Sequence, residues 1–331
     1  MIYYVPIVSV LVTLSLIAAI LSSKFGKKIQ DIPNERSLHS APIPRIGGIG
    51  LMAGVLSGWT LMLTSLVWWL VLPLIGLFIV SLLDDMRGLP VRQRMLAHVV
   101  AAAILVEGSG LLTGQNIVIA LAALLFMVWM TNLYNFMDGS DGLAGGMALF
   151  GFTTYGIAAL TGDNNIFAML NFSIGAAALG FLYYNFPPAK VFMGDAGSIP
   201  LGFLAAAMGV WGWQQGYWAV WFPLLVFSPF VVDASVTLVR RTLCRARITE
   251  AHREHYYQRA ILMGFGHRNT AFAEYALMLL VGVSALWGIG LDVMSQAKLL
   301  AWWCAIYSGL LMWIDRRWQM HQARQENTDV A

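Results

Sequence analysis

Residues 116–143 read NIVIALAALLFMVWMTNLYNFMDGSDGL, an apolar run followed directly by a polar, glycine-rich segment. An apolar run of about 17–25 residues is long enough to cross a bilayer as a helix. The segment after this run brings two carboxamides, two carboxylates and two glycines to the predicted membrane edge. Carboxylates next to hydrocarbon are costly and are usually retained for a function. The stretch therefore predicts a membrane-spanning helix that delivers polar chemistry to one membrane surface.

The composition of the whole chain is that of a membrane protein. Of its 331 residues, 59% are hydrophobic and only 11% are charged, and the mean hydropathy is +0.69. We expect an all-α integral membrane protein, with residues 1–331 forming a single polytopic domain, because no soluble segment is large enough to fold alone. Eleven apolar runs predict transmembrane helices, at about 2–22, 46–63, 67–83, 95–113, 116–133, 145–161, 165–184, 199–214, 217–239, 271–289 and 298–314.

The basic residues indicate how these helices are oriented. Of the 20 Lys and Arg residues, 19 fall on one face, in alternate loops or the C-terminal tail, and only Lys298 falls on the other. Positively charged loops face the cytoplasm. We therefore expect a periplasmic N-terminus, a cytoplasmic C-terminus and an active site built from five cytoplasmic loops. These predicted loops cover about 23–45, 84–94, 134–144, 185–198 and 240–270.

The second loop opens with two adjacent carboxylates, Asp84 and Asp85, at the end of the third predicted span. Carboxylates at a helix C-terminus oppose the helix dipole and repel each other, so helix propensity does not explain them. They could bind Mg²⁺ or act as a base. The alternative is a pair at the membrane interface that is neutralised by Arg87 and Arg92.

The third loop is the polar end of the opening stretch. Asn132, Asn135 and Asp138 occur at i, i+3 and i+6, on one face of a helix end, and Asp141 follows three residues later. A helix C-cap needs a single Gly or Asn, so capping alone does not account for two carboxylates. The pattern favours a functional site over a polar turn.

The fourth loop carries Asn185 and, between small residues, Asp195. Mg²⁺ is usually held by one or two carboxylates, with water and substrate phosphates in the other positions. Asp195 is therefore a candidate metal ligand. It could also cap the span that follows it, and the two roles are compatible.

The first and the last loop supply basic and imidazole side chains. His39 and Arg45 lie in a loop rich in Pro and Gly, and both could contact an anionic group. On a helix, His252, His255 and Arg259 would share one face at i, i+3 and i+7, which favours an anion over a metal because arginines are close. The alternatives are ordinary basic loops on the cytoplasmic face and a basic amphipathic helix lying on the membrane.

This distribution of ionisable residues argues against a transporter. A secondary transporter would place ionisable groups near mid-membrane and show inverted repeats. A flippase would need polar groups along the path of its lipid. In this chain the acidic candidates fall in loops of one face, and Asp233, inside the ninth predicted span, is expected to form a structural ion pair with Arg240 and Arg241.

In their order along the chain, the Asp-Asp pair, the 132–143 stretch, the block 185–198 and the last histidine-bearing loop resemble a known family. They are similar to the polyprenyl-phosphate N-acetylhexosamine-1-phosphate transferases of the glycosyltransferase 4 family, and the resemblance covers essentially the whole chain. The Ser-Leu-His, Pro-Arg-x-Gly-Gly and His-Arg-x-His-x-Tyr-Gln-Arg patterns resemble the branch that initiates O-antigen. Consecutive histidines and a lysine-threonine first loop, which would favour the peptidoglycan enzyme of this family, are absent from the sequence.

The resemblance implies a reaction and its participants. An N-acetylamino-sugar 1-phosphate would pass from a UDP-sugar to undecaprenyl phosphate, with release of UMP and with Mg²⁺ as cofactor, or Mn²⁺ in its place. The enzyme would lie in the bacterial inner membrane among membrane lipid, without a nucleic-acid partner, and a homodimer is left open. The alternatives are the peptidoglycan transfer of phospho-N-acetylmuramoyl-pentapeptide and a non-enzymatic polyprenyl-phosphate carrier or flippase.

The resemblance also implies roles for the candidate residues. Asp195 would be the chief Mg²⁺ ligand, with Asp141 as a second candidate, and Asp84 and Asp85 would lie beside the lipid phosphate. A phosphate monoester is largely dianionic at pH 7, so electrostatic roles are favoured over a strict general base. The implied substrate-binding residues are Asn132, Asn135, Asp138, Asp141, Asn185, His39, Arg45, His252, His255 and Arg259.

Overall fold

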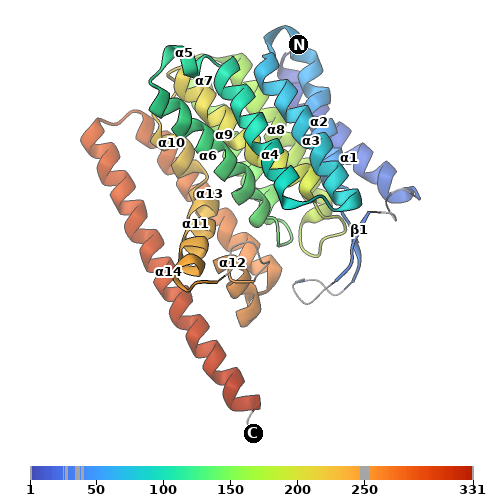
Figure 1. Ribbon diagram of the computed structural model, residues 1–331, viewed down its shortest axis with the longest axis vertical. Helices are drawn as coiled ribbons and strands as arrows, with labels where there is room; N and C mark the ends of the chain where they lie inside the picture. Colours follow the sequence, from blue (N-terminus) through green and yellow to red (C-terminus); the bar gives the residue numbers. More distant parts are fainter. Residues whose placement is uncertain are drawn as a thin grey trace.

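The protein is a bundle of α-helices with one short pair of β-strands (Figure 1). The computed structural model describes residues 2–24, 26, 29–33, 38, 41–246 and 253–329. The helices are α1 (Val5–Ser22), α2 (Gly47–Trp59), α3 (Trp68–Arg87), α4 (Val91–Gly108), α5 (Leu111–Gly114), α6 (Ile117–Phe136), α7 (Leu143–Thr161), α8 (Asn165–Asn185), α9 (Asp195–Gln214), α10 (Trp221–Val226), α11 (Ser228–Leu243), α12 (Tyr256–Ala260), α13 (Gly266–Ile289) and α14 (Val293–Asp329). Strand β1 (Gln30–Asp31) pairs antiparallel with β2 (Ile43–Pro44).

The prediction of an all-α integral membrane protein is confirmed. In the described part of the chain, nine helices are long and apolar enough to cross a membrane. Two of the eleven predicted spans take a different form. The span predicted at 95–113 is α4, an 18-residue helix that carries Arg92, Arg94 and Glu107.

The span predicted at 217–239 is divided between two helices. Helix α10 ends at Val226 and α11 begins at Ser228, on either side of Phe227. Pro229 lies in the first turn of α11, where its missing N–H is tolerated. Without an N–H, Pro229 cannot donate to the carbonyl of Leu225, four residues earlier, and this explains why α10 does not continue unbroken into α11.

Several helices extend beyond their predicted bounds into the polar motifs. Helix α3 continues to Arg87, so Asp84 and Asp85 lie in its last turn. Helix α6 continues to Phe136 and includes both asparagines of the opening stretch. Helix α9 begins at Asp195, four residues before the predicted start of its span at residue 199. The candidate residues are therefore held by helix ends, which are more rigid than loops.

The start of α9 is fixed against α2 by main-chain contacts. Gly47 N–H donates to Phe192 O (2.9 Å), and Gly48 N–H donates to Met193 O (2.8 Å). A Cβ added to Gly48 would lie 2.2 Å from the main-chain nitrogen of Gly197, in the first turn of α9. Small residues allow such close approach of helices in membranes. The position of Asp195 relative to α2 is thus set by backbone.

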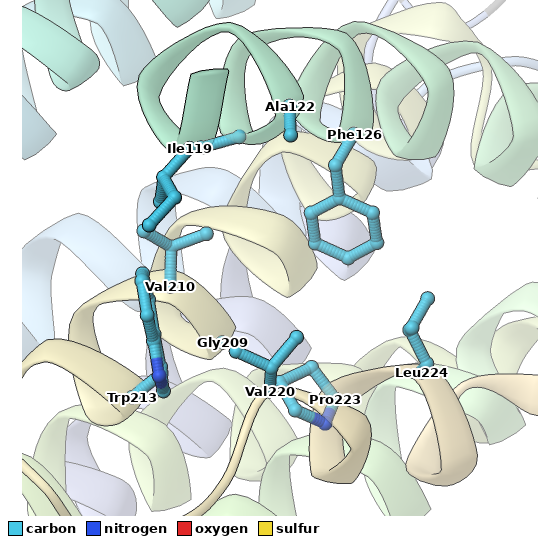
Figure 2. Close-up of a pocket in the computed structure, with 10 residues that line it drawn as sticks. Ile119, Ala122, Phe126, Gly209, Val210, Trp213, Val220, Pro223 and Leu224 are labelled. Carbon is cyan, nitrogen blue, oxygen red and sulfur yellow. The ribbon is translucent and has the colours of Figure 1, made fainter. Parts of the chain in front are cut away.

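An apolar cavity of about 220 Å³ lies between α6, α9 and α10 (Figure 2). Ile119 of α6, Trp213 of α9 and Pro223 of α10 are among the side chains that line it, and none of the lining residues is ionisable. Ile119 is near the start of α6 and Trp213 near the end of α9, whereas the polar motifs lie at the end of α6 and the start of α9. The cavity therefore lies at the end of these helices away from the polar residues.

Candidate active site

Asp85 of α3 caps the start of α9. The main-chain N–H of Asp195 donates to Asp85 Oδ1 (3.1 Å), and that of Ala196 donates to Asp85 Oδ2 (2.9 Å). The first N–H groups of a helix have no partner within the helix, and a carboxylate placed there is stabilised by the helix dipole. Gly194 precedes α9 with φ +72°, and a Cβ on it would lie 2.7 Å from Asp85 Oδ2. The carboxylate at the end of α3 is thus explained by a helix distant in sequence.

Arg94, in the first turn of α4, connects the other two carboxylates. Its Nη1 lies 3.1 Å from Asp84 Oδ2 and 3.3 Å from Asp195 Oδ2. The sequence suggested Arg87 and Arg92 as the neutralising partners of the Asp-Asp pair. The structure places Arg94 beside Asp84 instead, because the short turn between α3 and α4 brings the start of α4 back to the end of α3.

Asp138 follows the end of α6 and is close enough to the cluster for its pKa to respond to it. Burial raises the pKa of Asp138 well above its usual value, the charges of Asp195 and Asp85 raise it further, and Arg45 lowers it. Burial lowers the pKa of Arg45, but its bond to Asp31 (2.7 Å) and the charges of Asp31, Asp85 and Asp195 raise that pKa above its ordinary value. Arg45 is thus already paired, and among the residues that the structure describes the carboxylates near α9 outnumber the arginines beside them.

The carboxylates of Asp84 and Asp195 fit a divalent cation whose remaining ligands would be substrate phosphates and water. In the parts of the chain that the structure describes, no three His, Cys, Asp or Glu side chains are grouped as a metal site. Asp84 and Asp195 offer two carboxylate oxygens that here share one guanidinium nitrogen. Mg²⁺ commonly binds one or two carboxylates and completes its shell with water and phosphate oxygens, so two carboxylates suffice.

Asn132 and Asn135 lie on α6 next to α4 and α9. Asn135 Oδ1 accepts a hydrogen bond from Ser198 Oγ (2.8 Å), in the first turn of α9. Asn132 Nδ2 donates to Val128 O (2.7 Å) and lies 3.9 Å from Met95 Sδ, the residue after Arg94 on α4. The structure therefore brings both asparagines to the same end of the bundle as the carboxylates.

Asn185 and Asp141 have main-chain partners in this structure. The buried Asn185 accepts from Gly142 N–H at Oδ1 (2.8 Å), and its Nδ2 donates to Val191 O (2.9 Å). Asp141 Oδ2 accepts from Ala189 N–H (2.9 Å). These bonds tie the turn after α6 to the segment between α8 and α9. A direct part of either residue in binding substrate or metal stays a prediction.

His267, the second residue of α13, is a site residue that the sequence analysis did not single out. Its Nδ1 lies 3.0 Å from Ser140 Oγ and 3.9 Å from Asp141 Oδ1, and its Nε2 lies 3.2 Å from Leu38 O. It therefore joins the first, third and last predicted loops. The sequence offered one indication of its place, the glycine directly before it. In the structure this glycine, Gly266, has a φ of +72°, which marks a turn.

The prediction that His255 and Arg259 share a helical face is wrong. Helix α12 begins at Tyr256, so His255 precedes the helix. His255 Nδ1 lies 3.0 Å from Asp233 Oδ1 on α11, whereas Arg259 Nη1 lies 2.7 Å from Asp315 Oδ1 on α14. His39 and His252, the other two histidines predicted to bind substrate, lie outside the described residues.

The ion pair expected between Asp233 and the arginines of α11 is also wrong. Asp233 instead caps α12, because its two oxygens accept from the main-chain N–H groups of Tyr256 and Tyr257, both at 3.0 Å. Arg240 contacts Asp315 (2.9 Å), and Arg241 pairs with Glu254. Like Asp85, Asp233 is a carboxylate within one helix that supports the start of another.

The profile of glycosyl transferase family 4 matches residues 67–212, which contain the Asp-Asp pair, the 132–143 stretch and Asp195. The chain is 29% identical over 276 residues to the probable undecaprenyl-phosphate N-acetylglucosaminyl 1-phosphate transferase of Bacillus subtilis (strain 168). This match covers 77% of this chain and 76% of the relative. It is 27% identical over 311 residues to the decaprenyl-phosphate N-acetylglucosaminephosphotransferase of Mycolicibacterium smegmatis (80% and 75% covered). It is 26% identical over 324 residues to the phospho-N-acetylmuramoyl-pentapeptide-transferase of Staphylococcus haemolyticus (87% and 99% covered). The ordered motifs, the helical membrane fold and these matches agree, and together they support the family of polyprenyl-phosphate N-acetylhexosamine-1-phosphate transferases, within glycosyl transferase family 4, as the one that this chain resembles over most of its length.

Proposed function

We propose that this protein transfers an N-acetylamino-sugar 1-phosphate from a UDP-sugar to undecaprenyl phosphate, with release of UMP, at the cytoplasmic face of the bacterial inner membrane. The product would initiate an O-antigen or a related cell-envelope polysaccharide. The observation that carries the proposal is the cluster of Asp84, Asp85 and Asp195 at the meeting point of α3, α4 and α9. Relatives named for transfer of N-acetylglucosamine 1-phosphate to a polyprenyl phosphate support it.

The chemistry is a phosphoryl transfer. An oxygen of the lipid phosphate forms a bond to the sugar-bearing phosphorus, and the bond from that phosphorus to the bridging oxygen breaks. UMP leaves with that oxygen and its electron pair. Positioning and charge neutralisation supply most of the acceleration in such reactions. The protein's task is therefore to bring two phosphate groups together and to balance their charge.

Asp195 and Asp84 would hold Mg²⁺, which would neutralise charge on the transferring phosphates. Arg94 and Arg45 supply fixed positive charge beside these carboxylates. Both oxygens of Asp85 accept main-chain N–H groups, so this residue positions α9 and is poorly placed to remove a proton. A dianionic acceptor phosphate has no proton that must be removed before attack.

Purified protein should release UMP from a UDP-N-acetylamino sugar only when undecaprenyl phosphate and Mg²⁺ are both present. We expect EDTA to lower the rate at least about 100-fold and Mn²⁺ to restore part of it, since carboxylate and phosphate oxygens bind both ions. A panel of UDP-sugars assayed with a radiolabelled lipid acceptor would identify the donor. Preference for UDP-N-acetylmuramoyl-pentapeptide would instead favour the peptidoglycan reaction. Lipid movement in proteoliposomes without any UMP would favour a carrier.

Arg94→Gln should lower kcat/KM about 10- to 100-fold, because a positive charge beside the transferring phosphate is lost. The same change should lower the Mg²⁺ concentration that gives half-maximal rate, because the guanidinium no longer competes for Asp84 and Asp195. Magnesium titrations of the two proteins measure both effects. Arg92→Gln, on the exposed part of the same helix, is the matched control and should stay within about twofold of the unmodified protein. If Arg94→Gln needed the same Mg²⁺ concentration as the unmodified protein, Arg94 would not compete with Mg²⁺ for Asp84 and Asp195.

A further inference from the structure

Arg94 and His98 lie one turn apart on α4, and each carries a buried nitrogen atom beside the carboxylate cluster. Arg94 Nε and His98 Nδ1 have no hydrogen-bond partner among the residues that the structure describes. His98 as a whole is only 5% exposed. Because buried polar groups normally find a partner, two such atoms on successive turns of one helix call for an explanation.

The surroundings of His98 bring it close to both Arg94 and α6. Helix α4 packs against α3 and α6 (Figure 1). The charge of Arg94 and the side chain of Asn132 on α6 both act on the His98 ring, so both lie near it. A helical side chain leans back toward the turn before its own. The His98 ring is therefore directed toward the turn that carries Arg94.

The contacts of Asn132 determine which nitrogen of His98 can accept a hydrogen bond. Asn132 Nδ2 donates to Val128 O (2.7 Å), which leaves Asn132 Oδ1 as an acceptor for its neighbour. His98 Nε2–H is the donor that matches this oxygen, since His98 Nδ1 is the nitrogen without a described partner. A neutral imidazole protonated at Nε2 keeps a lone pair at Nδ1, whereas Arg Nε–H is always a donor. The two buried atoms are thus a matched acceptor and donor.

Asp84 and Asp195 hold the Arg94 guanidinium away from this acceptor. Arg94 Nη1 lies 3.1 Å from Asp84 Oδ2 and 3.3 Å from Asp195 Oδ2. A divalent cation on these two oxygens would repel the guanidinium, which would then have to leave them. The partner that α4 itself offers for the released side chain is His98 Nδ1.

We propose that His98 is a positioning residue that accepts the Nε–H of Arg94 once the guanidinium has left Asp84 and Asp195. The bond would keep Arg94 from returning to the carboxylates and would leave its Nη atoms free to contact a phosphate oxygen. This role rests on the proposed function, because it requires a cation on the two carboxylates.

Titration of the purified full-length protein with Mn²⁺ alone, followed by the electron paramagnetic resonance signal of the free ion, can test this role without either substrate. Mn²⁺ prefers the same carboxylate oxygens as Mg²⁺. His98→Leu should raise the Kd for Mn²⁺ about five- to tenfold, as expected when one hydrogen bond to a charged group is lost. His98→Asn keeps an accepting oxygen near the position of Nδ1 and should stay within about twofold of the unmodified protein.

These two variants separate hydrogen bonding from packing. Leu is closer to His in size than Asn is, so a packing role would make His98→Asn the more damaging change, which would overturn the proposal. His321→Leu is the matched control, because it removes a histidine that stacks on Trp318 near the end of α14. Its Kd for Mn²⁺ should be unchanged.

A double-mutant cycle with Arg94→Met tests whether His98 acts through Arg94. Met has no N–H to donate, so His98→Leu should have no further effect on the Kd for Mn²⁺ in this background. A five- to tenfold loss that persisted there would show that His98 acts on its own, by packing or as a metal ligand, and would overturn the proposal. Normal Mn²⁺ binding without UMP release from any UDP-sugar would instead reject the proposed reaction and leave the role of His98 standing.

Discussion

Asp195→Asn is expected to lower the rate of sugar-phosphate transfer by at least about 1000-fold, within the range found when a group that stabilises developing charge is removed. The substitution removes the carboxylate that we propose as the main Mg²⁺ ligand. It should leave the thermal midpoint of the protein without added metal unchanged or slightly raised, because Asp195 is one of several carboxylates that repel each other. UMP release and thermal unfolding in detergent measure the two effects.

The combination of lost activity and retained stability is what distinguishes a metal ligand from a structural residue. The main-chain N–H of residue 195 can still donate to Asp85 in this variant, so the start of α9 should remain capped. Activity within tenfold of the unmodified protein would remove the metal role. A large fall in the thermal midpoint would show that the carboxylate itself supports the fold.

Asp85→Asn should reduce both activity and stability. The carboxylate accepts two main-chain N–H groups at the start of α9, and an amide offers only one accepting oxygen there and no negative charge for the helix dipole. We expect a loss of about 2 kcal/mol in unfolding free energy, of the order found for hydrogen bonds to charged groups. Because α9 carries Asp195, the transfer rate should fall about 100-fold or more. Thermal unfolding and UMP release again provide the measurements.

Asp292→Asn is a matched control for this variant. Asp292 is an exposed carboxylate that caps α14, where its Oδ1 accepts from the main-chain N–H groups of Met294 (3.0 Å) and Ser295 (3.1 Å). Asn is as good an N-cap as Asp, so stability and activity should both stay near the unmodified values. If Asp85→Asn behaved like this control, Asp85 would not be the support for α9 that the structure indicates.

The class of fold could be predicted from the sequence because it depends on local composition. Runs of apolar residues determine which segments can cross a membrane, and nine helices of the required length and apolarity occur in the described ranges. The break at Phe227 was missed because the surrounding residues are mostly apolar, and Pro229 interrupts the helix by lacking a main-chain N–H, not by changing the hydropathy. Hydropathy does not report such a change of direction.

The candidate site was predictable in its residue types but only partly in its contacts. The sequence singled out Asp85 as anomalous at a helix C-terminus, yet its partner is the start of α9, 110 residues away. Arg94 was overlooked in favour of arginines nearer in sequence, because its position depends on how the α3–α4 turn reverses the chain. His267 and the α12 cap at Asp233 likewise depend on which helices pack together. Tertiary contacts of this kind leave no periodic signal in one sequence.

The contact between Gly48 and Gly197 has a consequence for which parts of this protein can change in sequence. Two backbones that touch cannot accept larger side chains, so this part of the site has almost no freedom to change its shape. The position of Asp195 relative to α2 is therefore fixed by backbone contact. The segments around Arg45 and His267 are instead held by side-chain contacts that other residues could replace. Substitutions can thus change the segments around Arg45 and His267 more readily than they can change the position of Asp195 relative to α2.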